Sequence, residues 1–214
     1  RIKAILKIGA PVAFQYTFEV GLFAGASLIA GKIGALDQAA HNVALTLASM
    51  TYMMATGIAS AITIKIGNSY GKENYDRLKT FAKIAYRIIL GFMIFTAIIF
   101  AVFNHTLASL MTTDKEVIAL AAQLLIIAGL FQLFDGTQVI GLGILRGIGD
   151  VNIPTIITLF AYWVIGLPTG YYMGVVLELG VQGVWYGLTF ALLVSSILLY
   201  MRYKYMIRKK FALS

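Results

Sequence analysis

The sequence has no cysteine and few charged residues, and each shortage narrows what the chain can be. Without cysteine the chain can form no disulfide and can offer no thiol nucleophile or Cys-based metal site. Charged residues make up 12% of its 214 residues, against about 25% in a typical soluble domain, whereas 60% are hydrophobic. A water-soluble fold cannot bury so much apolar surface, so we expect this chain to use the lipid bilayer as its solvent.

Six long runs with almost no charge divide the chain. Four of them lack Asp, Glu, Lys and Arg altogether, the first is interrupted only by Glu19, and the fourth only by Asp135. Each run exceeds the ~20 residues that a helix needs to cross ~30 Å of hydrocarbon. In the fifth run, Pro168 must remove a backbone hydrogen bond, which predicts a bend. We predict an all-α, polytopic membrane protein: a single six-helix transmembrane lobe over residues 1–214, with spans near 8–31, 40–64, 86–106, 117–143, 153–175 and 180–203.

The basic residues gather in alternate loops. A net charge of +8 could indicate nucleic acid binding, so their location decides its meaning. If alternate loops lie on opposite sides, one side holds 15 of the 17 Lys and Arg, including Arg1, Lys3 and Lys210, and the other holds only Lys32 and Lys115. By the positive-inside rule we expect both ends of this segment in the cytoplasm, and no nucleic acid as a partner.

Two carboxylates lie in the middle of apolar spans, Glu19 in the first and Asp135 in the fourth. Placing an ionisable residue there costs ~3 kcal/mol or more on insertion scales, so it indicates function by default. The alternative is a protonated or hydrogen-bonded carboxyl that only ties helices together. Glu19 follows Lys7 by twelve residues and Asp135 precedes Arg146 by eleven, so both lie roughly 16–18 Å from cytoplasmic charges. The two carboxylates can therefore share one level of the membrane.

Polar residues accompany both carboxylates on the same helical faces. Gln15 lies one turn before Glu19, and Gln132 and Gln138 flank Asp135 at three-residue spacing. Neighbouring carboxylates in a low dielectric repel each other, and the repulsion is relieved when the pair holds a proton or a metal cation. Oxygen ligands suit hard ions such as Na⁺. The pair predicts a site at which an ion and a positively charged substrate compete.

Aromatic residues near these positions have two interpretations. Tyr52 in the second span and Phe23, one turn after Glu19, could offer cation–π faces, although aromatic residues in membrane spans more often only pack. The sequence shows no nucleophile–base pair and no His/carboxylate metal cluster, so we expect neither an enzyme nor a cofactor.

Four short motifs follow one another along the chain. They are Ala39-Ala40-His41-Asn42-Val43-Ala44, Gln132-Leu133-Phe134-Asp135-Gly136-Thr137-Gln138, Leu145-Arg146-Gly147-Ile148-Gly149-Asp150 and Gly166-Leu167-Pro168-Thr169-Gly170-Tyr171. In combination and order they resemble the multidrug and toxic compound extrusion (MATE) family, in its NorM-like branch. The resemblance covers essentially the whole chain and corresponds to helices seven to twelve of the family's twelve.

This resemblance implies two six-helix lobes that face each other across a cleft and alternate between inward-open and outward-open states. It implies export of organic cations, such as cationic amphipathic drugs or dyes, in antiport with Na⁺ or H⁺ across a bacterial cytoplasmic membrane. Because the chain begins with Arg1 and shows no signal-peptide pattern, we expect it to start inside a longer polypeptide whose amino-terminal lobe lies outside this sequence.

The resemblance also implies roles for particular residues. A glutamate of the family's seventh helix and an aspartate of its tenth form the cation site, and they align with Glu19 and Asp135. An eighth-helix tyrosine near that site aligns with Tyr52. Some members carry a tyrosine one turn before the aspartate, where this chain has Phe131, so that hydroxyl ligand is lost. We expect Gln15, Phe23, Phe131, Gln132 and Gln138 to line the site or contact the substrate.

Two other functions stay open at this point. A flippase-like exporter of lipid-linked sugars or polysaccharide would favour a wide basic cavity, yet Arg146 is the one basic residue in the cytoplasmic link between the fourth and fifth spans. A non-transporting scaffold or channel subunit is also compatible with six spans, although it would leave the two buried carboxylates without a use.

Overall fold

The computed structural model describes residues 2–211, and side chains over residues 6–209. Arg1 lies outside the described residues, and so do the side chains of Lys3 and Lys210. Within this part of the chain all regular structure is helical, and six helical segments are long and apolar enough to cross a membrane, which confirms the predicted class. The elements are α1 (Ile2–Ile33), α2 (Ala35–Gly71), α3 (Tyr75–Val102), α4 (Asn104–Ser109), α5 (Lys115–Gly147), α6 (Asn152–Leu159), η1 (Phe160–Gly166), α7 (Leu167–Tyr171), η2 (Tyr172–Val176) and α8 (Gly180–Phe211).

Most helices extend beyond the apolar runs, because a helix can continue into water after it leaves the hydrocarbon. The third span shows the largest difference. Asn74 accepts a hydrogen bond from the backbone N–H of Arg77 and caps α3, so that this helix starts well before residue 86. At its other end α3 stops at Val102, four residues before the predicted boundary, and the short helix α4 follows.

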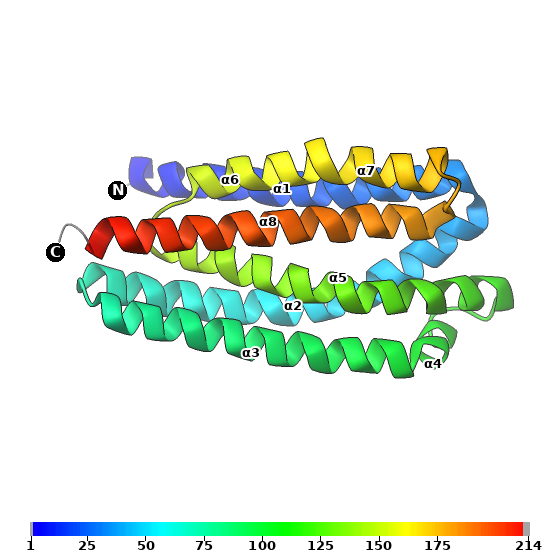
Figure 1. Ribbon diagram of the computed structural model, residues 1–214, viewed down its shortest axis with the longest axis horizontal. Coiled ribbons are helices and arrows are strands. Elements are labelled where there is room, and N and C mark those ends of the chain that lie inside the picture. Colours follow the sequence, from blue (N-terminus) through cyan, green and yellow to red (C-terminus); the bar gives the residue numbers. More distant parts are fainter. Residues whose placement is uncertain (1, 212–214) are drawn as a thin grey trace.

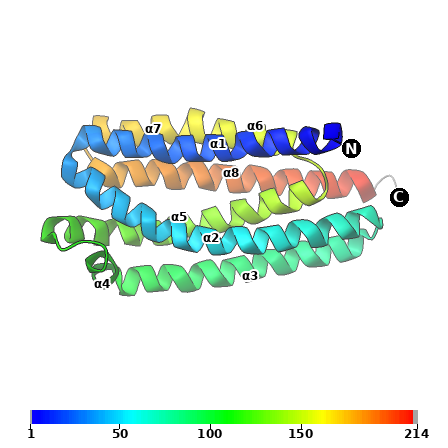
Figure 2. The ribbon, with the colours of Figure 1, turned by 180° about the vertical axis from the view of Figure 1, so that it is seen from behind.

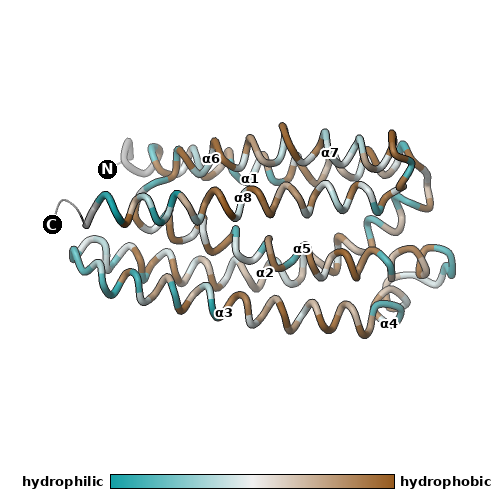
Figure 3. The backbone as a smooth tube through the Cα atoms, viewed as in Figure 1, coloured by the Kyte–Doolittle hydropathy of each residue, from teal (hydrophilic) through white to brown (hydrophobic). Residues whose placement is uncertain are grey.

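The helices form an elongated bundle in which α5 is central (Figures 1 and 2). Helix α5 packs against α2, α3 and α8, and α1 packs against α2 and the fifth span. The start of α1, the end of α8, the α2–α3 turn and the α5–α6 turn lie at one end of the bundle, which we call the terminal end (Figure 1). Hydrophilic residues concentrate near the two ends and the middle is largely hydrophobic (Figure 3). The basic loops that the sequence assigns to one side therefore do lie at one end.

The fifth span departs from regular α-helix on both sides of Pro168. Two π-helical segments, η1 and η2, flank the short helix α7 that contains this proline. This span packs closely on α8 because glycines meet there. A Cβ atom on Gly187 would lie 2.4 Å from the backbone of Gly170. Small residues at such a crossing let two helix backbones approach, as in many membrane bundles.

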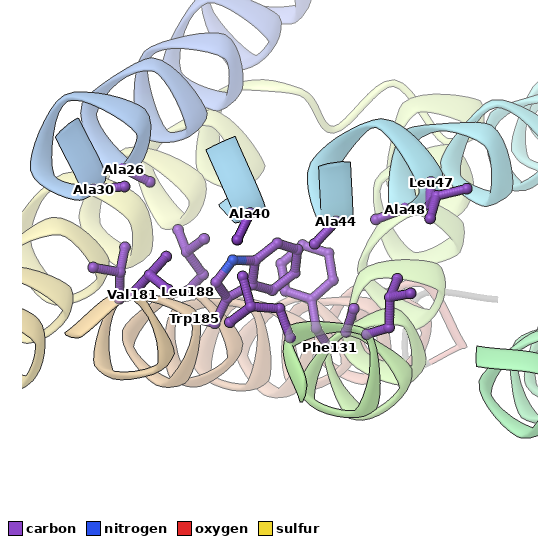
Figure 4. Packing of buried hydrophobic residues seen from close by; sticks show 14 of the residues in the cluster. Ala26, Ala30, Ala40, Ala44, Leu47, Ala48, Phe131, Val181, Trp185 and Leu188 are labelled. Carbon is purple, nitrogen blue, oxygen red and sulfur yellow. The ribbon is translucent and has the colours of Figure 1, made fainter. Parts of the chain in front are cut away.

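The buried side chains form two hydrophobic clusters, one in each half of the bundle. The first lies toward the far end, where the rings of Phe131 and Trp185 meet with centroids 5.3 Å apart beneath Ala40 and Ala44 of α2 (Figure 4). The second lies toward the terminal end and includes Ile89, Ile144 and Leu199.

Buried polar residues separate the two clusters along the helices. On α5, the first cluster reaches Phe131 and the second starts at Val139, and buried Asp135 lies between them. Helices α2, α3 and α8 and the fifth span repeat the pattern, and the layer consists of Thr51, Thr96, Gln132, Asp135, Gln138, Thr158 and Ser195. The bundle thus carries a polar layer at mid-depth, where the sequence places its two carboxylates.

Candidate functional site

Helices α1, α2 and α5 surround a cavity of about 410 Å³ at the depth of the polar layer. We call it the carboxylate cavity. Glu19 from α1 and Asp135 from α5 both line it, together with Tyr52 from α2. The volume lies within the ~300–1,000 Å³ of typical small-molecule sites. Two carboxylates that are 116 positions apart in the chain therefore meet at one space.

The carboxyl groups of Glu19 and Asp135 differ in their protein partners. They lie close enough to interact electrostatically, and the Tyr52 hydroxyl is within hydrogen-bonding reach of Glu19. The Asp135 side chain is 3% exposed, and its Oδ1 atom has no hydrogen-bond partner within residues 2–211. A buried oxygen without a partner is costly unless something binds it. The two carboxyl groups and the Tyr52 hydroxyl offer oxygen atoms that could hold a cation here, and Tyr16, Ser49 and Thr56 bring further hydroxyls to the same wall.

Aromatic side chains complete the wall of the carboxylate cavity. Tyr16 and Phe23 of α1 line it, as do Tyr52 and Phe131. The rings of Phe23 and Phe131 meet edge to face with centroids 6.2 Å apart. Aromatic faces beside carboxylates attract organic cations through both the ring quadrupole and the negative charge. The cavity can therefore accept either a small hard ion or the cationic part of a larger molecule.

A second, smaller cavity of about 30 Å³ adjoins the first on the side of the terminal end. Glu19 and Tyr52 line both cavities, whereas Gln15 and Arg146 line only the smaller one. A space of this size holds about one water molecule or one small ion. Glu19 thus stands between the larger cavity and a narrow polar space that leads toward the basic loops.

Arg146 is a site residue that the sequence reasoning missed. Its guanidinium lies close enough to Glu19 to attract the carboxylate, stands 5.8 Å from the Tyr16 ring centroid, and donates a long hydrogen bond of 3.5 Å to Gln15 Oε1. In the sequence, Arg146 counts toward the basic loops and belongs to one of the four motifs, but neither observation predicts a contact with Glu19. Because its contacts are with residues more than 120 positions away, no local spacing could have indicated them.

The three glutamines lie in different surroundings. Gln15 is buried, lines the small cavity, and donates to Thr155 Oγ1 at 3.0 Å. Gln132 accepts a hydrogen bond of 2.9 Å from Thr96 of α3, and Gln138 donates to the Tyr162 hydroxyl of η1.

Neither Gln132 nor Gln138 lines the carboxylate cavity. Successive residues of an α-helix are 100° apart, so the side chains of Gln132, Asp135 and Gln138 spread over an arc of about 120° around the helix axis. Because α5 has neighbouring helices on several sides, side chains that far apart meet different partners. All three polar side chains of α5 are buried, but only Asp135 lines the carboxylate cavity.

These features define a six-helix transmembrane lobe with a carboxylate pair at mid-depth. The family model described as MatE matches residues 11–172, and the chain belongs to the MATE family. It is similar to the probable multidrug resistance protein NorM of Bacillus cereus, with 38% identity over 93% of this chain and 44% of the relative. The corresponding protein of Agrobacterium fabrum is 36% identical over 96% of this chain and 45% of the relative.

Solved structures share the fold. A MATE protein in the straight conformation superposes with a TM-score of 0.92 at 21% identity, over 99% of this chain and 47% of that one. The eukaryotic MATE transporter AtDTX14 gives a TM-score of 0.88 at 22% identity, over 96% of this chain and 47% of that one. The chain thus spans somewhat less than half the length of the relatives and structures that it matches.

Proposed function

We propose that this chain forms one half of a secondary active transporter that exports organic cations in antiport with Na⁺ by alternating access. The observation that carries the proposal is the meeting of Glu19 and Asp135 in one aromatic-lined cavity at mid-depth. Intramembrane carboxylates that face a cavity rather than lipid mark ion and substrate pathways. The names of the curated relatives, multidrug resistance proteins, support a drug as the substrate class.

Competition for the carboxylate pair explains the exchange. A cation bound between Glu19 and Asp135, with Tyr52 as a further oxygen ligand, neutralises the charge that would otherwise attract an organic cation. Phe23 and Phe131 offer their faces to the substrate when the ion has left. Since either ligand lowers the affinity for the other, a gradient of the ion can drive the substrate in the opposite direction.

The proposal places a second lobe over the open side of the cavity. Val20 and Met53 at its rim are 67% and 70% exposed, so the surface around the cavity is apolar and uncovered by the described chain. Coverage of only 44–45% of the curated relatives supports a second half of similar size. We propose that the amino-terminal lobe of the same polypeptide packs here and that the two lobes enclose the substrate.

We further propose that the protein lies in a bacterial cytoplasmic membrane with the terminal end in the cytoplasm. The distribution of Lys and Arg supports this orientation. The lack of cysteine makes the chain suited to a labelling test. A membrane-impermeant thiol reagent applied to intact cells should label Lys115→Cys but not Lys72→Cys, and the reverse pattern would show the opposite orientation.

Transport itself is tested with the full-length protein in proteoliposomes. Efflux of a cationic dye is measured with an imposed Na⁺ gradient at fixed pH, and then with a pH gradient in the absence of Na⁺; protein-free liposomes give the background. We expect the Na⁺ gradient to drive efflux. If only the pH gradient does so, H⁺ is the coupling ion and the carboxylate pair keeps its role. If neither gradient changes dye movement, the transport proposal fails.

A further inference from the structure

A groove of about 960 Å³ runs between α3 and α8 at the terminal end, on the other side of α5 from the carboxylate cavity. We call it the α3–α8 groove. Leu133, Phe134 and Thr137 of α5 form its floor, whereas Phe131 and Asp135 of the same helix line the carboxylate cavity. The two sites therefore share one helix but no lining residue, and the function proposed above makes no use of the groove.

Charge in the groove is confined to one end and to one sign. Among the side chains that the structure describes, five basic ones and no Asp or Glu line it; they are Lys79, Lys83 and Arg87 on the first turns of α3 and Lys204 and Arg208 on the last turns of α8. Their spacing of four residues places them on one face of each helix. All five are exposed. The two helices thus present a basic mouth at the level where the chain meets the membrane surface.

Beyond the basic mouth the groove is mainly apolar, with Thr137 and Ser196 as polar lining residues. Leu90 follows Arg87 one turn deeper on α3, and Leu193, Ile197 and Met201 precede Lys204 on α8, which runs in the opposite direction. Ile197 and Met201 are 50% and 60% exposed. The groove is therefore amphipathic along its length, with positive charge at the membrane surface and a hydrophobic channel that descends toward the bilayer middle.

We propose that the α3–α8 groove binds an acidic phospholipid of the leaflet at the terminal end. The phosphate would be held by the basic mouth, where Arg side chains can bind it with two hydrogen bonds, and an acyl chain would lie over the α5 floor. Basic pockets between transmembrane helices bind anionic headgroups in this way. A free phosphate would gain nothing from the apolar channel, and a neutral lipid would bring no net charge opposite to that of the basic mouth.

Retention of basic loops by the positive-inside rule explains why Lys and Arg lie at this end, but not why five of them line one groove. Lys65 and Lys72 of this chain provide the contrast, because they lie at the same end, are exposed, and do not line the groove. A double variant at these two positions removes the same charge from the same surface as a double variant within the groove.

The test uses native mass spectrometry of the purified full-length protein, titrated in detergent with dioleoyl phosphatidylglycerol or dioleoyl phosphatidylcholine. We expect phosphatidylglycerol to bind preferentially. Lys83→Gln/Lys204→Gln should weaken it by roughly 10- to 30-fold, as expected for two basic contacts. Lys65→Gln/Lys72→Gln should change it by less than about twofold. Ile197→Trp, which fills the channel from a half-exposed position, should also weaken binding without lowering the unfolding temperature.

Each alternative gives a different result. Equal binding of the two lipids, or equal loss in the two double variants, would show general attraction to surface charge and overturn the proposal. Displacement of phosphatidylglycerol by millimolar inorganic phosphate, or equal affinity for a dihexanoyl analogue, would show an anion site without a role for the channel. Dimer formation that is lost in Ile197→Trp would assign the groove to a second copy of the protein.

Discussion

The close approach of the fifth span to α8 leaves no room for a side chain at Gly187. A Cβ on Gly187 would lie 2.4 Å from Cα and N of Gly170, about 1 Å short of ordinary van der Waals contact. The obstacle is backbone, so no side-chain rotation can relieve the clash. For Gly187→Ala the helices must separate, and overpacking of this kind costs about 1–3 kcal/mol. At about 2–4 °C per kcal/mol for a chain of this size, the unfolding temperature should fall by roughly 2–12 °C.

Gly91→Ala is the matched control, because a Cβ there meets nothing within 4 Å. Replacing an exposed helical glycine by alanine should be neutral or stabilising by up to about 1 kcal/mol. Thermal unfolding of both variants in the same detergent, followed by size-exclusion fluorescence, gives the comparison. If Gly187→Ala unfolds within about 1 °C of the unsubstituted protein, α7 and α8 are not packed through these glycines.

Two further predictions concern single polar contacts. Tyr52→Phe removes the hydroxyl that we propose as a further oxygen ligand of the ion, so the Na⁺ concentration for half-maximal dye efflux should rise. An unchanged Na⁺ dependence would assign Tyr52 to packing. Asp150→Asn should lower the free energy of unfolding by about 1–3 kcal/mol, because Asp150 Oδ2 accepts a 2.7 Å hydrogen bond from Arg202 Nε of α8. The control Asp76→Asn lies at an exposed position and should have little effect. Equal stability of the two variants would show that the Asp150–Arg202 contact does not stabilise the fold.

The sequence alone predicted the six apolar spans and the common depth of Glu19 and Asp135. Charge-free runs predicted six spans, because the cost of a charge in hydrocarbon is far larger than any local preference. Counting residues from the nearest basic loops placed Glu19 and Asp135 at one depth, and in the structure both line one cavity. Tyr52 joined them only through the family resemblance, since nothing local distinguishes it from a packing aromatic. The roles of these three residues stay predictions.

Features that depend on which helices become neighbours were beyond the sequence. The contact between Arg146 and Gln15, and the separate hydrogen bonds of Gln132 and Gln138, are decided by packing between distant helices. Most helix ends also lie outside the predicted spans, because a run of apolar residues shows which part of a helix crosses the hydrocarbon and not where the helix is capped. Asn74 begins α3 in the polar loop, well before the apolar run that defined the third span.

We propose that Glu19 and Asp135 hold the coupling ion, and substitutions that neutralise each carboxylate test this role. Glu19→Gln and Asp135→Asn keep the side-chain shape but cannot bind a cation or release a proton. The controls are Glu116→Gln and Asp76→Asn, which remove the same groups at exposed helix starts. In proteoliposomes with the full-length protein, we predict that both site variants lose gradient-driven efflux of a cationic dye and that both controls retain it. Normal efflux by either site variant would show that the substituted carboxylate does not hold the coupling ion.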